Sequence, residues 1–350
     1  MKALSISIAA ALALVTQSVP ATKPTSINLR EGTNMAAALS PDGRTLIIDL
    51  QGSLWTLPAS GGPANRVTDE YLDARQPAWA PDNRRVAFQG YADGVWHIYV
   101  MNADGSGLRA VTAGPFDDRE PSWSRDGDRI AFSSDRSGNY DVFDLDVAGG
   151  EIRQLTNNPA NDYAPAYSPV NATIAFVSER EDRRGIWAVD TATATERSIA
   201  PAAGAVSAPS WHPDGSRVIY NVIASNRSNL LLDGREITRD EDVFPFRAQW
   251  ISPTEILYTA DGKIKTRGVA GGDAVPAERS GSTPDPLEDL AGGARAVPED
   301  GQRPVGTDLR RLPERLSYLH GLLLSEFALV CDSLHFCARP PQRTLYARHK

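Results

Sequence analysis

Aspartate and asparagine side chains recur at one position of this sequence and are its best candidates for a binding site. Asp73, Asp117 and Asn161 follow one another at intervals of 44 residues, and Asp118 and Asp162 add a second carboxylate at the next position. Gathered on one surface, these side chains would form an acidic rim that attracts a metal ion, another cation or a basic peptide segment. A second interpretation stays open, because Asp and Asn often accept hydrogen bonds from the backbone of their own loop.

Residue patterns typical of catalysis are missing. The sequence contains no His-x-His pair, no His-Glu-x-x-His and no Gly-x-Ser-x-Gly. Cys331, His335 and Cys337 lie close together, but their spacing matches no common zinc-binding pattern. His97 and His212, the histidines outside the C-terminal tail, are expected at a loop edge and in a solvated turn. We therefore predict a chain that is not an enzyme and holds no metal or cofactor.

A repeat of 40 to 44 residues supplies the elements that position the candidate side chains. Its first marker is the turn Ser40-Pro41-Asp42-Gly43, whose altered copies are centred on Pro81, Arg125, Pro169, Pro213 and Pro253. Its second marker is a large apolar residue every 44 positions, at Trp55, Tyr99, Phe143, Trp187 and Leu231. Each repeat has the residue pattern of four strands, in the third copy over 120–123, 129–133, 140–146 and 152–156.

Four antiparallel strands in about 40 residues are typical of one propeller blade. The sequence therefore predicts an all-β fold, a six-bladed β-propeller of four-stranded antiparallel blades over residues 22–272. Residues 25–30 are a candidate outer strand of the sixth blade, because an open ring would expose a strand edge. One aromatic residue per repeat is expected to fill the gap between neighbouring blades, at Trp79, Trp123, Tyr167, Trp211 and Trp250.

Loops that lead into the innermost strands of a propeller surround the mouth of its central channel. The candidate side chains lie in such loops, and the loop that begins with Asp135 and Arg136 is expected on the same face, its Asp–Arg pairs forming salt bridges between blades. The Ser-Pro-Asp-Gly turns belong to the opposite face. A channel cation such as calcium stays open as an alternative to a site without a metal. The predicted rim residues are Asp73, Asp117, Asp118, Arg119, Asp135, Arg136, Asn161, Asp162 and Tyr163.

Both ends of the chain differ from the repeat. Lys2, the apolar run 3–15 and small residues before position 22 indicate a signal peptide over residues 1–21, cleaved after Ala21. An uncleaved membrane anchor stays open as the alternative, whereas no membrane span is expected after cleavage. Residues 273–350 are interpreted as a linker and a non-repeat tail, irregular, disordered or partly helical around 309–330. Their abrupt change of character also fits a reading-frame slip or a truncation.

Composition and charge exclude further classes of protein. Hydrophobic residues make up 41% and charged residues 23% of the 350 positions, which is typical of a globular chain. The net charge of −8 argues against a nucleic-acid binder, because such proteins usually carry a basic face. Together with the signal peptide, this predicts a periplasmic or secreted protein.

The segment PSWSRDGDRIAFSSDR, residues 121–136, resembles the repeat of TolB-type propellers, and several copies over residues 35–270 match at once. TolB is a periplasmic six-bladed propeller that binds partner proteins of the Tol–Pal system, so the resemblance implies a protein-binding scaffold without catalysis. TolB proper carries an α/β domain before its propeller, which this sequence is expected to lack. The segments GPFDDREP (114–121) and NNPANDY (157–163) are similar to TolB-like propellers that precede a metal-dependent amidohydrolase domain in larger secreted proteins.

Two functions follow from these observations. The first is a non-catalytic periplasmic propeller that acts as a protein- or ligand-binding scaffold. Its partner is expected to be a protein or peptide of the cell envelope, docked on the predicted rim, and the chain itself is expected to be a monomer. The second is a propeller fragment or accessory domain of a secreted amidohydrolase, or of a peptidase, whose catalytic domain is absent from this chain.

Overall fold

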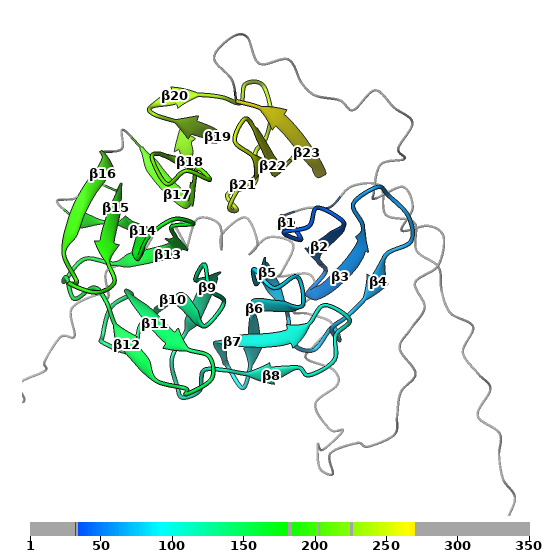
Figure 1. Cartoon of the computed structure of the whole chain (residues 1–350), viewed down its shortest axis with the longest axis horizontal. Helices are drawn as coiled ribbons and strands as arrows, with labels where there is room; N and C mark the ends of the chain where they lie inside the picture. Colours follow the sequence, from blue (N-terminus) through cyan, green and yellow to red (C-terminus); the bar gives the residue numbers. More distant parts are fainter. Residues whose placement is uncertain (1–31, 33, 181–183, 202–203, 225–226, 270–350) are drawn as a thin grey trace, which may run out of the picture.

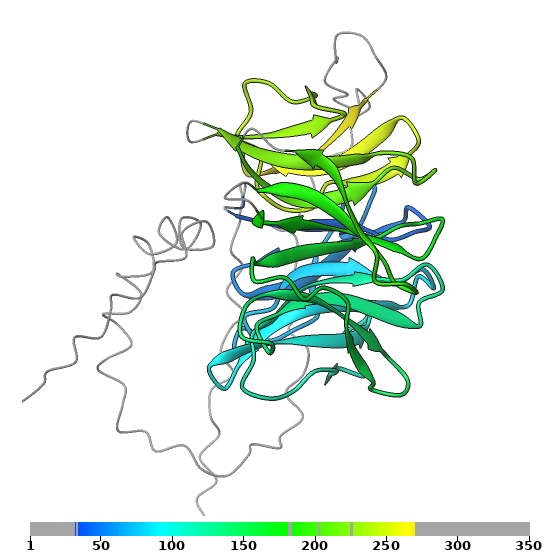
Figure 2. The same cartoon turned by 90° about the vertical axis from the view of Figure 1, so that its left-hand side faces the viewer.

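The computed structural model describes residues 32, 34–180, 184–201, 204–224 and 227–269. These residues form six antiparallel sheets, the blades, arranged in a ring around a central axis (Figure 1). Figure 2 shows the ring from the side, with loops and turns at both of its faces. The predicted all-β six-bladed propeller is confirmed. The predicted signal peptide and C-terminal tail lie outside the described residues.

Each of the first five blades has four strands in the order of the chain. Blade 1 contains β1 (Ala37–Leu39), β2 (Thr45–Leu50), β3 (Ser53–Pro58) and β4 (Asn65–Arg66). Blade 2 contains β5 (Arg75–Trp79), β6 (Arg85–Ala92), β7 (Val95–Asn102) and β8 (Arg109–Ala110). Blade 3 contains β9 (Asp118–Trp123), β10 (Arg129–Ser134), β11 (Asp141–Asp146) and β12 (Ile152–Gln154). Blade 4 contains β13 (Asp162–Tyr167), β14 (Thr173–Ser178), β15 (Gly185–Asp190) and β16 (Glu196–Pro201). Blade 5 contains β17 (Ala205–Trp211), β18 (Val218–Ala224), β19 (Arg227–Leu232) and β20 (Arg235–Glu236).

Blade 6 has three strands among the described residues, β21 (Gln249–Ser252), β22 (Glu255–Ala260) and β23 (Lys263–Gly268). Its predicted outer strand, residues 25–30, lies outside them. The N–H of Gly32 donates to the carbonyl of Gly262 at 3.0 Å, beside the turn between β22 and β23. The amide of Gln249 exchanges two hydrogen bonds with the backbone of Leu39, at 2.7 and 2.8 Å. The last blade is thereby joined to the first.

The repeated aromatic residues join each blade to the one before it. The indole N–H of Trp123 donates to the carbonyl of Ala78 at 3.1 Å, and that of Trp211 donates to Ala166 at 3.0 Å. A buried indole that also satisfies its N–H stabilises an interface through both area and hydrogen bonding. The predicted filling of the gaps between blades is confirmed, and the same kind of bond recurs at Trp79 and Trp250.

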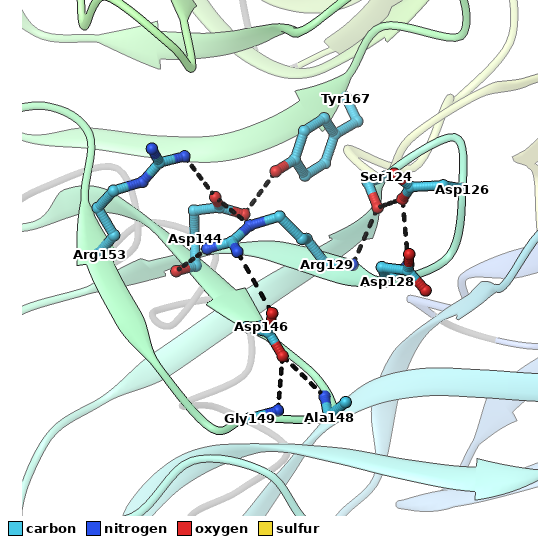
Figure 3. A network of polar contacts seen from close by, with 10 residues as sticks. All are labelled: Ser124, Asp126, Asp128, Arg129, Asp144, Asp146, Ala148, Gly149, Arg153 and Tyr167. Carbon is cyan, nitrogen blue, oxygen red and sulfur yellow. Dashed lines mark hydrogen bonds and ion pairs between the residues drawn. The ribbon is translucent and has the colours of Figure 1, made fainter.

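At Tyr167 the bond between blades runs to a carboxylate instead (Figure 3). The Tyr167 hydroxyl of blade 4 donates to Asp144 of blade 3 at 2.5 Å, and the side chain of Asp144 is fully buried. The same carboxylate accepts from Arg129 at 2.6 Å and from Arg153 at 2.9 Å. Burial and the Asp144 charge raise the pKa of Tyr167 above its usual range, so the hydroxyl keeps the proton that it donates.

A second buried ion cluster lies in blade 6. Glu241, 8% exposed, accepts from the guanidinium of Arg267, from the Tyr258 hydroxyl at 2.8 Å and from the Lys265 ammonium at 3.1 Å. The Arg267 guanidinium also donates to the carbonyl of Ile237 at 3.2 Å. The segment that follows β20 is therefore fastened to β23.

The strand order gives the ring two different faces. We call one the loop face; it carries the connections between blades, such as 69–74, 113–117 and 157–161, and the hairpins between second and third strands, such as 135–140. We call the other the turn face; it carries the Ser-Pro-Asp-Gly turns, such as 40–43, and the connections between third and fourth strands. The predicted rim and the predicted turn are therefore on opposite faces, as expected.

A β-bulge recurs in the innermost strands. Gln76, Glu120, Ala164 and Ala208 are 44 residues apart, and each has a positive φ, between 47° and 60°. Each lies where the pairing of the inner strand with the second strand shifts register. Because the bulge frees these N–H groups from the ladder, three of them donate to a side chain of the preceding blade: Gln76 to Asp49 at 2.7 Å, Glu120 to Gln89 at 2.9 Å and Ala164 to Glu120 at 2.6 Å. A one-residue insertion is therefore part of the repeat in blades 2 to 5.

Candidate functional site

The first set of predicted rim residues holds the backbone of the loop face. Asp117 accepts the backbone N–H of Trp96 at 2.9 Å, and Asn161 accepts that of Tyr140 at 3.2 Å. Asp73 instead binds Arg75, its Oδ1 lying 3.0 Å from the Arg75 Nε. Asp117 and Asn161 therefore accept from the backbone, as in the second interpretation, but from the adjoining hairpin and not from their own loop, and Asp73 forms a salt bridge.

The second set is buried. Asp118 and Asp162 have no exposed area, and each binds an arginine 18 residues later, Arg136 at 2.7 Å and Arg180 at 2.9 Å. Burial raises the pKa of Asp162, against the lowering effect of its hydrogen bonds and of Arg180. Arg136 and Asp118 both belong to blade 3, so this salt bridge lies within one blade. The prediction of a salt bridge between blades is wrong for Arg136.

The remaining predicted residues complete the same local network. Asp135 accepts the backbone N–H of Asp117 at 3.0 Å, and Arg119 donates to the Asp117 carboxylate at 3.0 Å. The Tyr163 hydroxyl donates to Glu179 at 3.3 Å. Each of these carboxylates is thus bonded through at least one oxygen to an arginine or a backbone N–H. Among the described residues, no group of three or more His, Cys, Asp and Glu side chains is arranged to hold a metal ion.

The two propeller histidines are less exposed than expected. His97 lies within β7 and is 3.8 Å from Asp118. His212 is 5% exposed, and its Nε2 lies 2.9 Å from the carbonyl of Pro253 in the next blade. Its ring packs edge-on against Trp250, with 4.6 Å between the centroids. Its role is therefore to join blades 5 and 6 on the turn face.

Aromatic and arginine side chains are what the loop face offers to a ligand. Trp96 is half-buried, with the guanidinium of Arg75 5.7 Å and that of Arg119 5.4 Å from its ring. Tyr91 packs against the same indole at 5.3 Å, tilted by 57°. We call Arg75, Tyr91, Trp96 and Arg119 the Trp96 cluster. Each arginine of the cluster forms a salt bridge with the aspartate two residues before it, Arg75 with Asp73 and Arg119 with Asp117.

An exposed tyrosine lies beside this cluster. Tyr71 is 80% exposed, and Tyr91 within the cluster is 41% exposed. Their loops touch, because the backbone N–H of Tyr91 donates to the carbonyl of Leu72 at 2.7 Å. In blade 4 the half-buried Tyr163 continues the pattern, with the Arg184 guanidinium 5.9 Å from its ring. Aromatic and cationic groups therefore extend over the loop face from blade 2 to blade 4.

Trp96, Arg75, Tyr91 and Tyr71 are not among the residues predicted from the sequence. A signal was present for two of them. Trp96 precedes Tyr140 by 44 residues, and Arg75 precedes Arg119 by the same interval. Attention to the carboxylates alone missed this second periodic set.

The centre of the ring is occupied by a side chain from the last blade. Arg247, just before β21, extends its guanidinium to the inner strands of blades 3, 4 and 5. Its N–H groups donate to the carbonyls of Pro121, Pro165 and Pro209. Figure 1 shows the strands that carry these prolines, β9, β13 and β17, lining the centre of the ring with β21.

Among the described residues, no helix has the length and apolar character needed to cross a membrane. No curated protein matches the chain in sequence. Among solved structures, the putative TolB of Agrobacterium tumefaciens is 21% identical, with 69% of this chain and 79% of that one covered and a TM-score of 0.51. TolB of Acinetobacter baumannii is 22% identical, with 58% of this chain and 53% of that one covered and a TM-score of 0.51. At these identities the likeness is one of fold.

A family model described as the TolB beta propeller domain, PD40, matches residues 62–237, from the end of blade 1 to the last strand of blade 5. This match covers half of the chain and contains the Trp96 cluster. Together with the repeat and the six blades, it shows that the chain belongs to the TolB β-propeller domain family.

Proposed function

We propose that this chain is a non-catalytic binding scaffold that docks a protein or peptide of the cell envelope on its loop face, over blades 2 to 4. The observation that carries the proposal is the Trp96 cluster with the exposed Tyr71 beside it. Tyr, Trp and Arg are the residues that contribute most to the energy of protein interfaces. A surface that carries all three on a fixed backbone is suited to bind a partner without a change of shape.

The kind of partner follows from the charges. The carboxylates of the loop face are bonded to arginines or to backbone N–H groups, so they offer little free charge to a metal ion or a basic peptide. Rings flanked by arginines suit a segment with aromatic or aliphatic side chains and exposed carbonyl or carboxylate groups. We therefore favour an extended peptide of mixed character over the cation that the sequence first suggested.

The cellular location and the oligomeric state of the protein complete the proposal. The signal-like N-terminus supports a periplasmic or secreted protein, and the resemblance to TolB supports a partner within the cell envelope. Fold alone does not specify function, so the docking face is the part of the proposal to be tested. We propose that the chain acts as a monomer in this role.

The test uses two double variants. Y71A/Y91A removes exposed rings of the loop face, and the control L108A/V170A removes the other two large exposed apolar side chains among the described residues, which lie on the turn face. Envelope proteins captured by the wild-type chain are identified, and the affinity of the purified partner is then measured for all three proteins. We expect Y71A/Y91A to weaken binding at least about ten-fold and the control to stay near wild type. Equal affinities for the three proteins would contradict the proposal.

A second candidate is the propeller of a larger secreted hydrolase, an amidohydrolase or a peptidase. One observation favours it: 71% of this chain matches 46% of a puromycin-hydrolysing peptidase of Mycobacterium tuberculosis, at 14% identity and a TM-score of 0.52. In such a protein the loop face would border the entry to a catalytic domain. A neighbouring reading frame that encodes His-x-His would support this candidate. If the chain alone binds an envelope partner with full affinity, the result would favour the first proposal, a binding scaffold.

A further inference from the structure

The centre of the propeller presents hydrogen-bond acceptors without matching donors. Pro121, Pro165 and Pro209 occupy the same position in the inner strands of three consecutive blades. Proline has no N–H, so at this level each strand can offer only its carbonyl oxygen to the axis. The residue before each proline has a positive φ and lies at the bulge, where the ladder to the second strand is interrupted. The repeat therefore builds a partial ring of carbonyl oxygens.

The Arg247 side chain fits this ring. Its Nε lies 3.2 Å from the Pro209 carbonyl oxygen, its Nη1 lies 3.3 Å from that of Pro121, and its Nη2 lies 2.6 Å from that of Pro165. A guanidinium is planar and has N–H groups on all three nitrogens, so it can serve three acceptors spaced around it. A lysine ammonium is a compact group and a metal ion is a sphere, and neither matches this arrangement as well.

The positive charge of Arg247 is held mainly by these carbonyl dipoles. Among the described residues, no carboxylate lies within ion-pair distance of the Arg247 guanidinium. Burial lowers the pKa of Arg247 to about 10, with the Glu120 charge acting in the opposite direction, so the group stays protonated at neutral pH. Rings of backbone carbonyls bind cations in the same manner in other proteins.

We infer that the channel level formed by Pro121, Pro165 and Pro209 is a cation site of the guanidinium type, which the protein fills with its own Arg247. In the wild type, Arg247 therefore takes the place that a metal ion or a small ligand would need in order to reach these carbonyls. Without the side chain, the same carbonyls would accept a free guanidinium ion. This inference concerns the centre of the ring and does not depend on the docking face.

The test is chemical rescue of R247A. We expect the variant to melt about 6 °C or more below wild type, because three buried carbonyls lose their donors. Guanidinium chloride at about 20 mM should restore at least about a third of the lost melting temperature, since a ligand of the folded state alone stabilises it. As a denaturant, the salt at this concentration lowers stability by only about 0.1 kcal/mol. Sodium chloride at the same ionic strength should have no such effect.

A matched control is R85A. Arg85 also donates to a carbonyl of the next blade, that of Gly127 at 2.9 Å, but it lies on the turn face with 32% of its side chain exposed. We expect no rescue of R85A by guanidinium. Rescue of both variants, rescue of R247A by sodium chloride, or no rescue of R247A would each overturn the inference.

A second variant keeps the test valid if R247A does not fold in plain buffer. R247K retains a charge that already occupies the ring, so it should fold with lower stability than wild type and gain nothing from guanidinium. Refolding yields of R247A are then compared in guanidinium and sodium chloride. A higher yield in guanidinium supports the inference, and equal yields overturn it.

Discussion

Removing the carboxylate of Asp144 should destabilise the whole ring, because this group joins two blades. It is fully buried and accepts three hydrogen bonds, from Arg129 and Arg153 of its own blade and from Tyr167 of the next (Figure 3). Hydrogen bonds to a charged group contribute about 1.5–3 kcal/mol each when the partner cannot turn to water. The three donors differ in how easily they can bind water once the carboxylate is removed.

The magnitude follows from how exposed each donor is. The side chains of Arg129 and Arg153 are 28% and 45% exposed, so in D144A both recover most of their bond energy from water. The Tyr167 hydroxyl is more enclosed and loses about 1–3 kcal/mol. We expect D144A to lower the free energy of unfolding by about 3 kcal/mol, which is about 6–12 °C in melting temperature for a ring of this size.

The assay is urea unfolding followed by circular dichroism, on D144A, Y167F and the double variant. The two single changes remove the same bond, so their effects should overlap by about 1–2 kcal/mol in the double-mutant cycle. D146A is the matched control; its carboxylate is 37% exposed and lies 3.7 Å from Arg129. A loss below about 1 kcal/mol in D144A, or strictly additive effects of D144A and Y167F, would show that the Asp144–Tyr167 bond does not stabilise the contact between blades 3 and 4.

Three further predictions concern stability. E241A should lower the free energy of unfolding by about 3–5 kcal/mol, because it leaves a buried guanidinium without its partner, whereas E70A, which breaks a solvent-exposed pair, should cost less than about 1 kcal/mol in the same urea assay. Burial raises the pKa of Asp49 to about 6, so the stability gained from its protonation is full below about pH 4 and is lost as the pH rises through 6. The difference in unfolding free energy between wild type and D49N should therefore change between these pH values. A constant difference would contradict the raised pKa. Gly215 has a φ of 71° and a Cβ built there would lie 2.2 Å from Val170, so G215A should destabilise by about 2–4 kcal/mol and V170A should recover the part due to overlap, as a double-mutant cycle would measure.

The fold could be predicted because its information is repeated. Any one copy of the turn, such as Ser252-Pro253-Thr254, is a weak signal, but six copies at a nearly constant interval leave few alternatives to a closed ring of blades. The role of the aromatic residue in each repeat followed for the same reason. What the sequence did not reveal is the partner of each indole N–H, since a carbonyl 40 or more residues earlier leaves no trace in residue type.

The candidate site was harder to predict because aspartate has the same sequence signal whether it is exposed or buried. The difference at Asp118 and Asp162 comes from an arginine 18 residues later, and that interval was visible in both repeats. This repeated interval alone could therefore have predicted that the two aspartates are buried and not exposed. The position of Arg247 could not be predicted in this way. The sixth repeat matches the pattern poorly, and the contacts of Arg247 reach across the ring to other blades.

Arg247 also has a consequence for the order of events during folding. Its bond to Pro121 joins residues 126 positions apart, and it involves the last blade to leave the ribosome. Contacts of such long sequence separation slow folding, because much chain entropy is lost before they form. Blades 1 to 5 can form their local hairpins during synthesis, but the inner strands of blades 3 to 5 receive this common donor only when the last blade arrives. We therefore expect a nascent chain that stops before residue 247 to remain an open, aggregation-prone arc.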